Sequence, residues 1–154
     1  MSTKLDYSGT YLTGIGPYLN EKGGLMMQVI NKTGGASVKG HIYNLSGAND
    51  FAAIKTVVAY AGSVLVCWEA GVADGDWMWC VYCGPAQVYL SAAGTRGQMV
   101  RACLAADGTK ADGTANTSAW PTASPQNTDA TGIAIGSALE TTSGAGLCWT
   151  LVAK

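Results

Sequence analysis

Short apolar stretches separated by glycine-containing turns set the strongest limit on how this 154-residue chain can fold. The stretches are rich in β-branched and aromatic residues, as strands are. Turn sequences such as Thr33-Gly34-Gly35 and Asp107-Gly108 lie between them. This pattern predicts an all-β fold, either a small β-sandwich or a barrel of short antiparallel strands. The predicted strands cover residues 25–31, 37–45, 54–60, 63–69, 77–83, 86–90, 98–105, 133–139 and 147–152.

Three segments do not follow this pattern of short apolar stretches and turns. Residues 1–24 contain glycines and tyrosines without strand alternation, which predicts an extended N-terminal arm before a β domain over residues 25–154. Residues 106–131 form a long polar loop within that domain, and a loop of this length is usually functional or disordered. Residues 46–53 are predicted to make one helical turn, with Asn49 or Asp50 as its N-cap.

The composition limits the possible partners. Hydrophobic residues make up 48% of the chain, enough for a core, whereas charged residues make up only 12% and the net charge is −1. Without a basic field, nucleic acid and anionic membranes are not expected partners. The sequence has no apolar run long enough to span a bilayer, and its first residues lack the apolar segment of a signal peptide. A neutral surface favours assembly with other proteins, because few ions must lose their water; a neutral, soluble β domain is the alternative.

The five cysteines do not form a recognisable metal or disulfide pattern. An odd number without a signal peptide argues against a disulfide framework. Cys80 and Cys83 have the spacing of a zinc or redox motif, but the surrounding residues 76–83 are typical of a buried strand. On a strand, residues three apart point to opposite faces, so the two sulfurs would diverge. We therefore predict free, structural thiols and no zinc.

No group of residues predicts catalysis. The single histidine, His41, lies in an alternating strand pattern and lacks the partners of a nucleophilic triad. Asp74 and Asp76 flank Gly75 in a turn, and turn formation explains them better than calcium binding. The sequence predicts a protein that is not an enzyme, with no catalytic residues, no cofactor and no metal.

Aromatic residues are the best candidates for partner binding. Tyr7, Tyr11 and Tyr18 are spaced along the predicted arm, and Trp120 lies in the middle of the long polar loop. Ordering an arm costs about 1–2 kcal/mol per residue, so it needs contacts such as tyrosines provide. We predict that these tyrosines contact a neighbouring copy or another protein; folding back onto the chain's own β domain is the alternative. Trp120 is expected to pack either on this protein or on a partner.

The remaining tryptophans leave another function open. Exposed aromatic rings bind sugar faces, which would suit a carbohydrate-binding or host-attachment module. However, Trp68, Trp77, Trp79 and Trp149 lie inside predicted strands, where packing in the core is the expected explanation.

Several sequence blocks, in order, resemble head structural proteins of tailed bacteriophages. The resemblance covers roughly residues 27–152, and each block alone is weak because glycine, alanine and valine dominate. The blocks are residues 29–40 (VINKTGGASVKG), 69–77 (EAGVADGDW), 79–89 (WCVYCGPAQVY), 95–97 (TRG) and 132–140 (GIAIGSALE).

This resemblance implies a β-rich capsid decoration, or cement, protein without catalysis or cofactor. Such a protein is made in the cytoplasm of the bacterial host and sits on the outer surface of the capsid in the virion. It bridges subunits of the major capsid protein and is commonly a homotrimer. Another virion role, such as a head-fibre base or a tail subunit, is the alternative within the same class.

Overall fold

The computed structural model describes residues 18–55, 64–90, 93–102, 115–117 and 133–153, and these residues form strands and turns without a helix. The prediction of an all-β fold is therefore confirmed, and the architecture is that of barrels. No helix in the described ranges could cross a membrane. The strands are β1 (Tyr18–Leu19), β2 (Leu25–Asn31), β3 (Ile42–Leu45), β4 (Ala52–Lys55), β5 (Val64–Cys67), β6 (Trp77–Leu90), β7 (Met99–Ala102), β8 (Ala115–Thr117), β9 (Ile133–Ala138) and β10 (Gly146–Val152).

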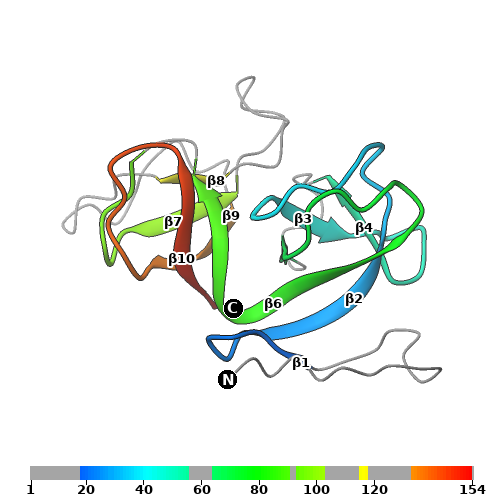
Figure 1. Ribbon diagram of the computed structural model, residues 1–154, viewed down its shortest axis with the longest axis horizontal. Helices are drawn as coiled ribbons and strands as arrows, with labels where there is room; N and C mark the ends of the chain where they lie inside the picture. Colours follow the sequence, from blue (N-terminus) through cyan, green and yellow to red (C-terminus); the bar gives the residue numbers. More distant parts are fainter. Residues whose placement is uncertain (1–17, 56–63, 91–92, 103–114, 118–132, 154) are drawn as a thin grey trace.

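The strands close into two barrels that lie side by side and share β6 (Figure 1). In the first barrel the neighbours around the ring are β2, β4, β3, β5 and the first half of β6, which returns to β2. In the second barrel they are the second half of β6, β10, β9, β7 and β8. A single parallel pair, Leu90 with Ala115, closes the second ring. Closure leaves each barrel without a free edge among these strands.

Strand β6 crosses from one barrel to the other without interruption. Its first half, Trp77 to Cys83, pairs with β2, and its second half, Gly84 to Leu90, pairs with β10. The sequence predicts two strands broken at Gly84-Pro85, and this prediction is wrong. Gly84 has a φ of +87°, a value that glycine adopts easily because it has no Cβ. The strand therefore bends at Gly84 and continues, instead of ending there.

The two barrels have the same connectivity. In each barrel, numbering the five strands in chain order, the first strand pairs with the third in parallel. The other four pairs are antiparallel: third with second, second with fourth, fourth with fifth, and fifth with first. Strand β6 is the fifth strand of the first barrel and the first strand of the second. The chain is therefore a tandem structural repeat, which the sequence did not predict.

Corresponding residues of the two barrels make corresponding hydrogen bonds. The Gly40 N–H donates to Cys67 O at 2.8 Å, and the Gly97 N–H donates to Ala138 O at 2.7 Å. Gly40 and Gly97 both follow a basic residue and have φ values of +83° and +80°. The repeat thus extends from the order of the strands to individual turns.

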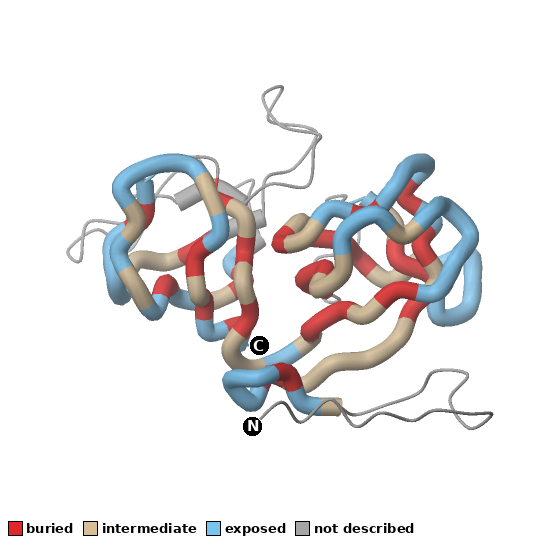
Figure 2. The backbone as a smooth tube through the Cα atoms, viewed as in Figure 1, coloured by how far each residue is buried: buried red, intermediate tan, exposed pale blue. Residues whose placement is uncertain are grey.

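Buried residues alternate along most of β6 and β10, whereas β5 is buried at every residue because both of its faces are covered (Figure 2). Each barrel has its own core. One cluster fills the first barrel, with Val29, Tyr43, Leu65, Met78 and Cys80 among its members. The other cluster fills the second barrel and continues into the outward-facing residues of the first: Ile42, Val64, Val66 and Val81 join Ala86, Val88, Leu90, Val100, Ile135, Ala138, Cys148 and Val152. The barrels are therefore fused by a continuous core.

Several local predictions differ from the structure. Residues 46–51 form bends and a turn rather than a helical turn, and Ala52 and Ala53 belong to β4. Ser46 replaces the predicted caps, because its Oγ accepts the N–H groups of Ala48 and Asn49 at 3.1 Å. Strand β3 starts at Ile42 instead of residue 37, since Gly40 turns the chain in the left-handed region.

Two short strands were not expected. Strand β1 lies within the predicted arm and pairs with the start of β2, Tyr18 opposite Met26. Strand β8 lies within the predicted polar loop and pairs with β7. Both are two or three residues long and are held by their partners rather than by their own pattern.

Candidate interaction surface

The tryptophans of the described strands and turns lie outside both cores. Trp77 is 41% exposed, and Trp68, Trp79 and Trp149 are half-buried. The expectation that these rings pack in the core is wrong for Trp77, Trp79 and Trp149, whereas Trp68 is half-buried and packs against the core cluster of the second barrel. The cause is alternation: Met78, Cys80 and Cys148 point inward, so the tryptophans beside them point outward.

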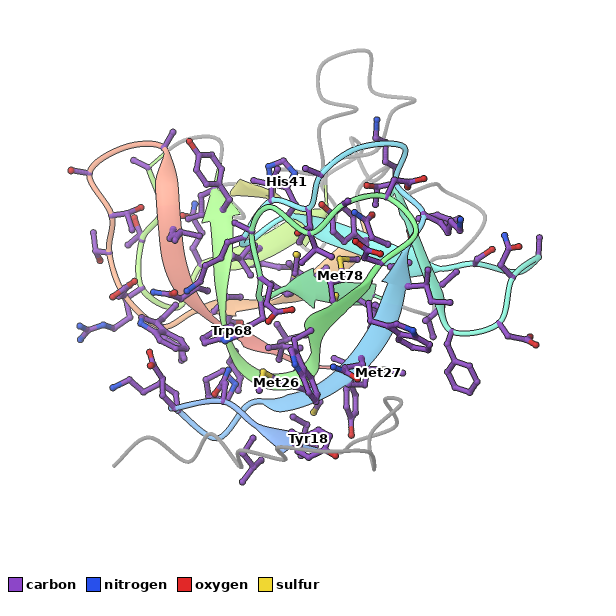
Figure 3. All side chains as sticks on the ribbon, turned by 45° about the vertical axis from the view of Figure 1, so that its right-hand side comes forward. Tyr18, Met26, Met27, His41, Trp68 and Met78 are labelled. Atoms are coloured by element: carbon purple, nitrogen blue, oxygen red, sulfur yellow. The ribbon has the colours of Figure 1, made fainter. Side chains whose placement is uncertain are left out.

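On the outer face of the first barrel, Trp79 is opposite Gln28 and touches Tyr18. Their register pairs Gln28 of β2 with Trp79 of β6. The Tyr18 and Trp79 rings meet edge to face, with centroids 4.7 Å apart. Figure 3 shows Tyr18 on the far side of β2 from Met78, which lies within the first barrel. The aromatic ring of Tyr18 thus contacts its own β domain, while remaining partly exposed.

The second barrel repeats this pairing of a glutamine with a tryptophan. Gln87 of β6 is opposite Trp149 of β10, as Gln28 is opposite Trp79. Around Trp149 three leucines are exposed: Leu139 by 42%, Leu147 by 39% and Leu151 by 41%. We call these three residues the leucine stripe. Exposed apolar residues grouped on one sheet face are typical of surfaces that bind other proteins.

Trp79 and Trp149 are each held by a glutamate through the same kind of hydrogen bond. The backbone N–H of Trp79 donates to the Glu69 carboxylate at 2.9 Å, and the backbone N–H of Trp149 donates to the Glu140 carboxylate at 2.7 Å. The return bonds also match, from Trp68 N to Trp79 O and from Leu139 N to Trp149 O. A glutamate followed nine or ten residues later by tryptophan was the sequence signal that could have revealed the repeat.

Two tryptophans meet where the barrels adjoin, and lysines lie over them. The rings of Trp68 and Trp149 are 6.1 Å apart and tilted by 49°. The Lys39 ammonium lies 4.5 Å from the centre of the Trp68 ring, and the Lys22 ammonium lies 6.0 Å from that of Trp149. Trp68 and Met26 also pack against the shared core (Figure 3). Because lysines and core residues contact these rings, the pair is a poor platform for stacking a sugar.

The remaining predicted partner residues, Tyr7, Tyr11 and Trp120, lie outside the described residues, as does Cys103. Tyr18 itself is anchored by the residues that follow it. Asn20 donates from Nδ2 to Pro85 O at 2.6 Å and accepts the N–H groups of Lys22 and Gly24. The end of the predicted arm is thus joined to the point where β6 bends.

The cysteines of the described residues are free thiols, as predicted. Cys80 is buried and Cys83 is exposed, which confirms that the two sulfurs point to opposite faces. Cys67 and Cys148 are also buried, and burial raises the pKa of the Cys148 thiol. No cluster of three or more metal-binding side chains occurs in the described ranges.

Other candidate residues have structural surroundings. His41 lies between the rings of Tyr43 and Tyr89, with centroids 6.5 and 6.1 Å away. Tyr43 is buried, and the loss of water around its hydroxyl raises its pKa to about 12. Asp74 accepts the Gly34 N–H at 2.8 Å and so ties two turns together.

Comparison with known proteins shows a likeness in fold. No family model matches the sequence, and no curated protein does. A solved structure, the head fibre gp8.5 N base of bacteriophage phi29, superimposes with a TM-score of 0.50 over 84% of this chain and 93% of that one. The two sequences are 17% identical over this match. The chain thus has a fold similar to that of a phage head-fibre base.

Proposed function

We propose that this chain is a non-catalytic structural protein of a tailed-bacteriophage head, which binds the outer surface of the capsid and stabilises the shell. The observation that supports this most is the likeness in fold to a head-fibre base, which extends over 93% of the chain in that solved structure. The sequence blocks that resemble phage head proteins support the same class independently.

The physical role of such a protein is to resist the pressure of packaged DNA. Packed phosphates repel one another and push outward on the shell. A protein that binds only the expanded lattice stabilises it by mass action, and many copies act together. This role needs neutral surfaces that fit a partner. It does not need a pocket or a titratable site.

The surface proposed for the contact is the leucine stripe with Trp149. It joins exposed leucines to a fixed tryptophan on a closed barrel, so binding would bury apolar area without reordering the backbone. The proposed partners are the major capsid protein and further copies of this chain, arranged as a homotrimer on the particle.

The test is cosedimentation of the purified protein with expanded, undecorated capsids. We expect the native protein to bind and to raise the temperature at which capsids release their DNA. A Leu139→Glu, Leu151→Glu variant should keep its melting temperature, because both side chains are about 40% exposed, yet bind at least tenfold more weakly.

The matched control is Phe51→Glu. Phe51 is 45% exposed, a value close to those of the two leucines, but it lies in a loop of the first barrel. Full binding by this control and loss by the leucine variant would support the stripe. Loss of capsid binding by the Phe51→Glu variant alone would indicate that the contact lies on the first barrel. No binding by the native protein to any capsid form would contradict the proposed function.

The arm is proposed as a second contact, through Tyr7 and Tyr11. Because Tyr18 and Asn20 are joined to the β domain, a truncation must stop before them. A chain lacking residues 1–16 should fold normally and bind capsids more weakly. Unchanged binding would show that the arm is not an anchor.

A head-fibre base is the second candidate, and the fold likeness favours it as well as it favours a cement protein. The two roles differ in what the bound protein does. A cement protein stabilises the empty lattice by itself, whereas a fibre base attaches a further protein to the head. Decorated capsids that are no more stable than bare ones, but that capture a fibre protein from the same phage, would select the fibre base.

A further inference from the structure

Two buried cysteines lie side by side on neighbouring strands of the first barrel. Cys67 is the last residue of β5, and its direct partner in the register is Cys80 of β6. Both are 0% exposed and belong to the same core cluster. Neither the proposed function nor the interaction surface makes use of them.

The backbone geometry brings the two sulfurs close together. The backbone N–H of Cys67 donates to His41 O at 2.9 Å, so the backbone N–H and C=O of Cys67 point toward the β3 side rather than toward β6. The next residue, Trp68, donates to Trp79 O at 2.9 Å. Cys67 and Cys80 are therefore a non-hydrogen-bonded pair, in which the Cα atoms are about 4.5 Å apart. Disulfides need Cα atoms roughly 4.4 to 6.8 Å apart, so this pair is within reach of a bond.

The two thiols differ in acidity. The hydrogen bond that Cys80 donates to the Cys67 sulfur lowers the pKa of the Cys67 thiol. Burial raises the pKa of Cys80 well above its ordinary range. Cys67 is thus the more nucleophilic member of the pair, and Cys80 holds its proton.

We propose that Cys67 and Cys80 form an intramolecular disulfide when the protein meets hydrogen peroxide. The Cys67 thiolate attacks one peroxide oxygen, the O–O bond breaks, and the products are a sulfenic acid and, after protonation, water. The Cys80 sulfur then attacks the Cys67 sulfur, its proton and the hydroxyl leave as a second water, and the S–S bond forms. Two thiols are oxidised and one peroxide is reduced.

The bond would tie β5 to β6, the strand shared by both barrels. It closes a loop over residues 67–80, which contains the turn with Asp74 and Gly75. Closing a loop of this length restricts the unfolded chain. We expect Tm to rise by about 5–10 °C, less any strain in the bond. The oxidised first barrel would then be locked.

The experiment treats the full chain, carrying Cys83→Ser and Cys103→Ser, with hydrogen peroxide. These substitutions remove the exposed thiol and the thiol outside the described residues, and leave Cys67, Cys80 and Cys148. We expect the intact mass to fall by two hydrogen atoms and a digest to contain the peptides of Cys67 and Cys80 joined. Dithiothreitol should restore the mass and lower Tm again.

Cys148 is the matched control within the same molecule. It is buried, its pKa is also raised by burial, and its register partner is Val88 rather than a cysteine. It should not appear in any joined peptide. Cys80→Ser in the same background should instead gain oxygen at Cys67 and show no rise in Tm.

Three results would overturn the proposal. One is an unchanged mass at peroxide concentrations that oxidise Cys83 of the native chain. Another is a joined peptide that contains Cys148. The third is oxygen gained only at Met78, whose sulfur lies 4.0 Å from that of Cys67. Because the native chain can be digested and mapped directly, these outcomes do not depend on whether a variant folds.

Discussion

Single glycines decide how closely the two barrels approach each other. At Gly40 the O atom accepts the Tyr89 N–H at 2.9 Å, which joins a turn of the first barrel to β6 in the second. An added Cβ at Gly40 would lie 2.5 Å from Leu147 Cδ2 and 2.7 Å from Tyr89 N. At the equivalent Gly97 nothing lies within 4 Å of an added Cβ. The repeat therefore provides a pair of glycines with the same backbone and different surroundings.

Alanine at these two glycines should separate backbone strain from steric overlap. Both substitutions place a Cβ on a residue with φ near +80°, which costs about 1–2 kcal/mol. We expect Gly97→Ala to lower the free energy of unfolding by this amount. Gly40→Ala should cost about 1–3 kcal/mol more, because the barrels must also move apart. Urea titration measures both, and equal losses would contradict a close approach at Gly40.

The hydroxyl of Tyr43 makes stability depend on pH in the alkaline range. Its pKa in the fold is about 12 against 10.0 in the unfolded chain, because burial disfavours the anion. This difference stabilises the fold fully below pH 10, and the stabilisation is lost as pH rises from 10 through 12. We expect Tyr43→Phe to show a smaller loss of unfolding free energy over this interval, measured by urea titration at each pH. A parallel pH dependence in the variant would exclude Tyr43 as the source.

At the scale of elements, the same hairpin arrangement occurs in both barrels. In each barrel the fourth and fifth strands are joined by a turn whose glutamate accepts the N–H of the outward-facing tryptophan. These N–H groups are partly buried and need a partner within the protein. The glutamates therefore hold the two strands of each hairpin together.

Removing either carboxylate should destabilise the hairpin to which it belongs. Glu69→Ala and Glu140→Ala each leave one N–H without its acceptor, which costs about 1–3 kcal/mol. Glu69→Gln and Glu140→Gln keep an acceptor oxygen and should cost less. Thermal unfolding followed by tryptophan fluorescence measures all four variants. A glutamine variant as unstable as its alanine counterpart would mean that the acceptor oxygen is not what matters.

At the scale of the whole molecule, the shared strand and the shared core link the two barrels. Ile42, Val64 and Val66 on the outside of the first barrel are buried in one cluster with residues of the second barrel. Separating the barrels would expose this apolar surface to water, at about 25 cal/mol per Å². The two barrels should therefore unfold together.

We expect a single unfolding transition, although the architecture has two rings. Calorimetric and van't Hoff enthalpies should agree, and fluorescence and circular dichroism should give coincident curves. Val66→Ala, at the junction, should lower Tm without splitting the transition. Two separate transitions in the native chain would contradict a common core.

The sequence determined the fold class through local chemistry. Strand β2 was predicted to the residue and β10 to within one residue, because their alternation and their flanking glycines are local signals. The two ends of β6 were also predicted, but not its continuity through Gly84-Pro85. The opposite orientation of Cys80 and Cys83 follows from the same period of two. Assembly with other proteins, which the neutral composition and Tyr7, Tyr11, Tyr18 and Trp120 predict, stays a prediction.

Only the tertiary structure decided how the strands close. Whether Gly84-Pro85 ends a strand or bends it depends on β10 and Gly24 lying against it, which no local pattern records. Strands β1 and β8 exist because partners distant in sequence supply their hydrogen bonds. The tryptophans face outward because the inward positions beside them fill the barrels. Alternation in the sequence shows that a strand has two different faces. Which of the two faces is buried depends on contacts between strands that are far apart in the chain, and these contacts form only when the barrel closes.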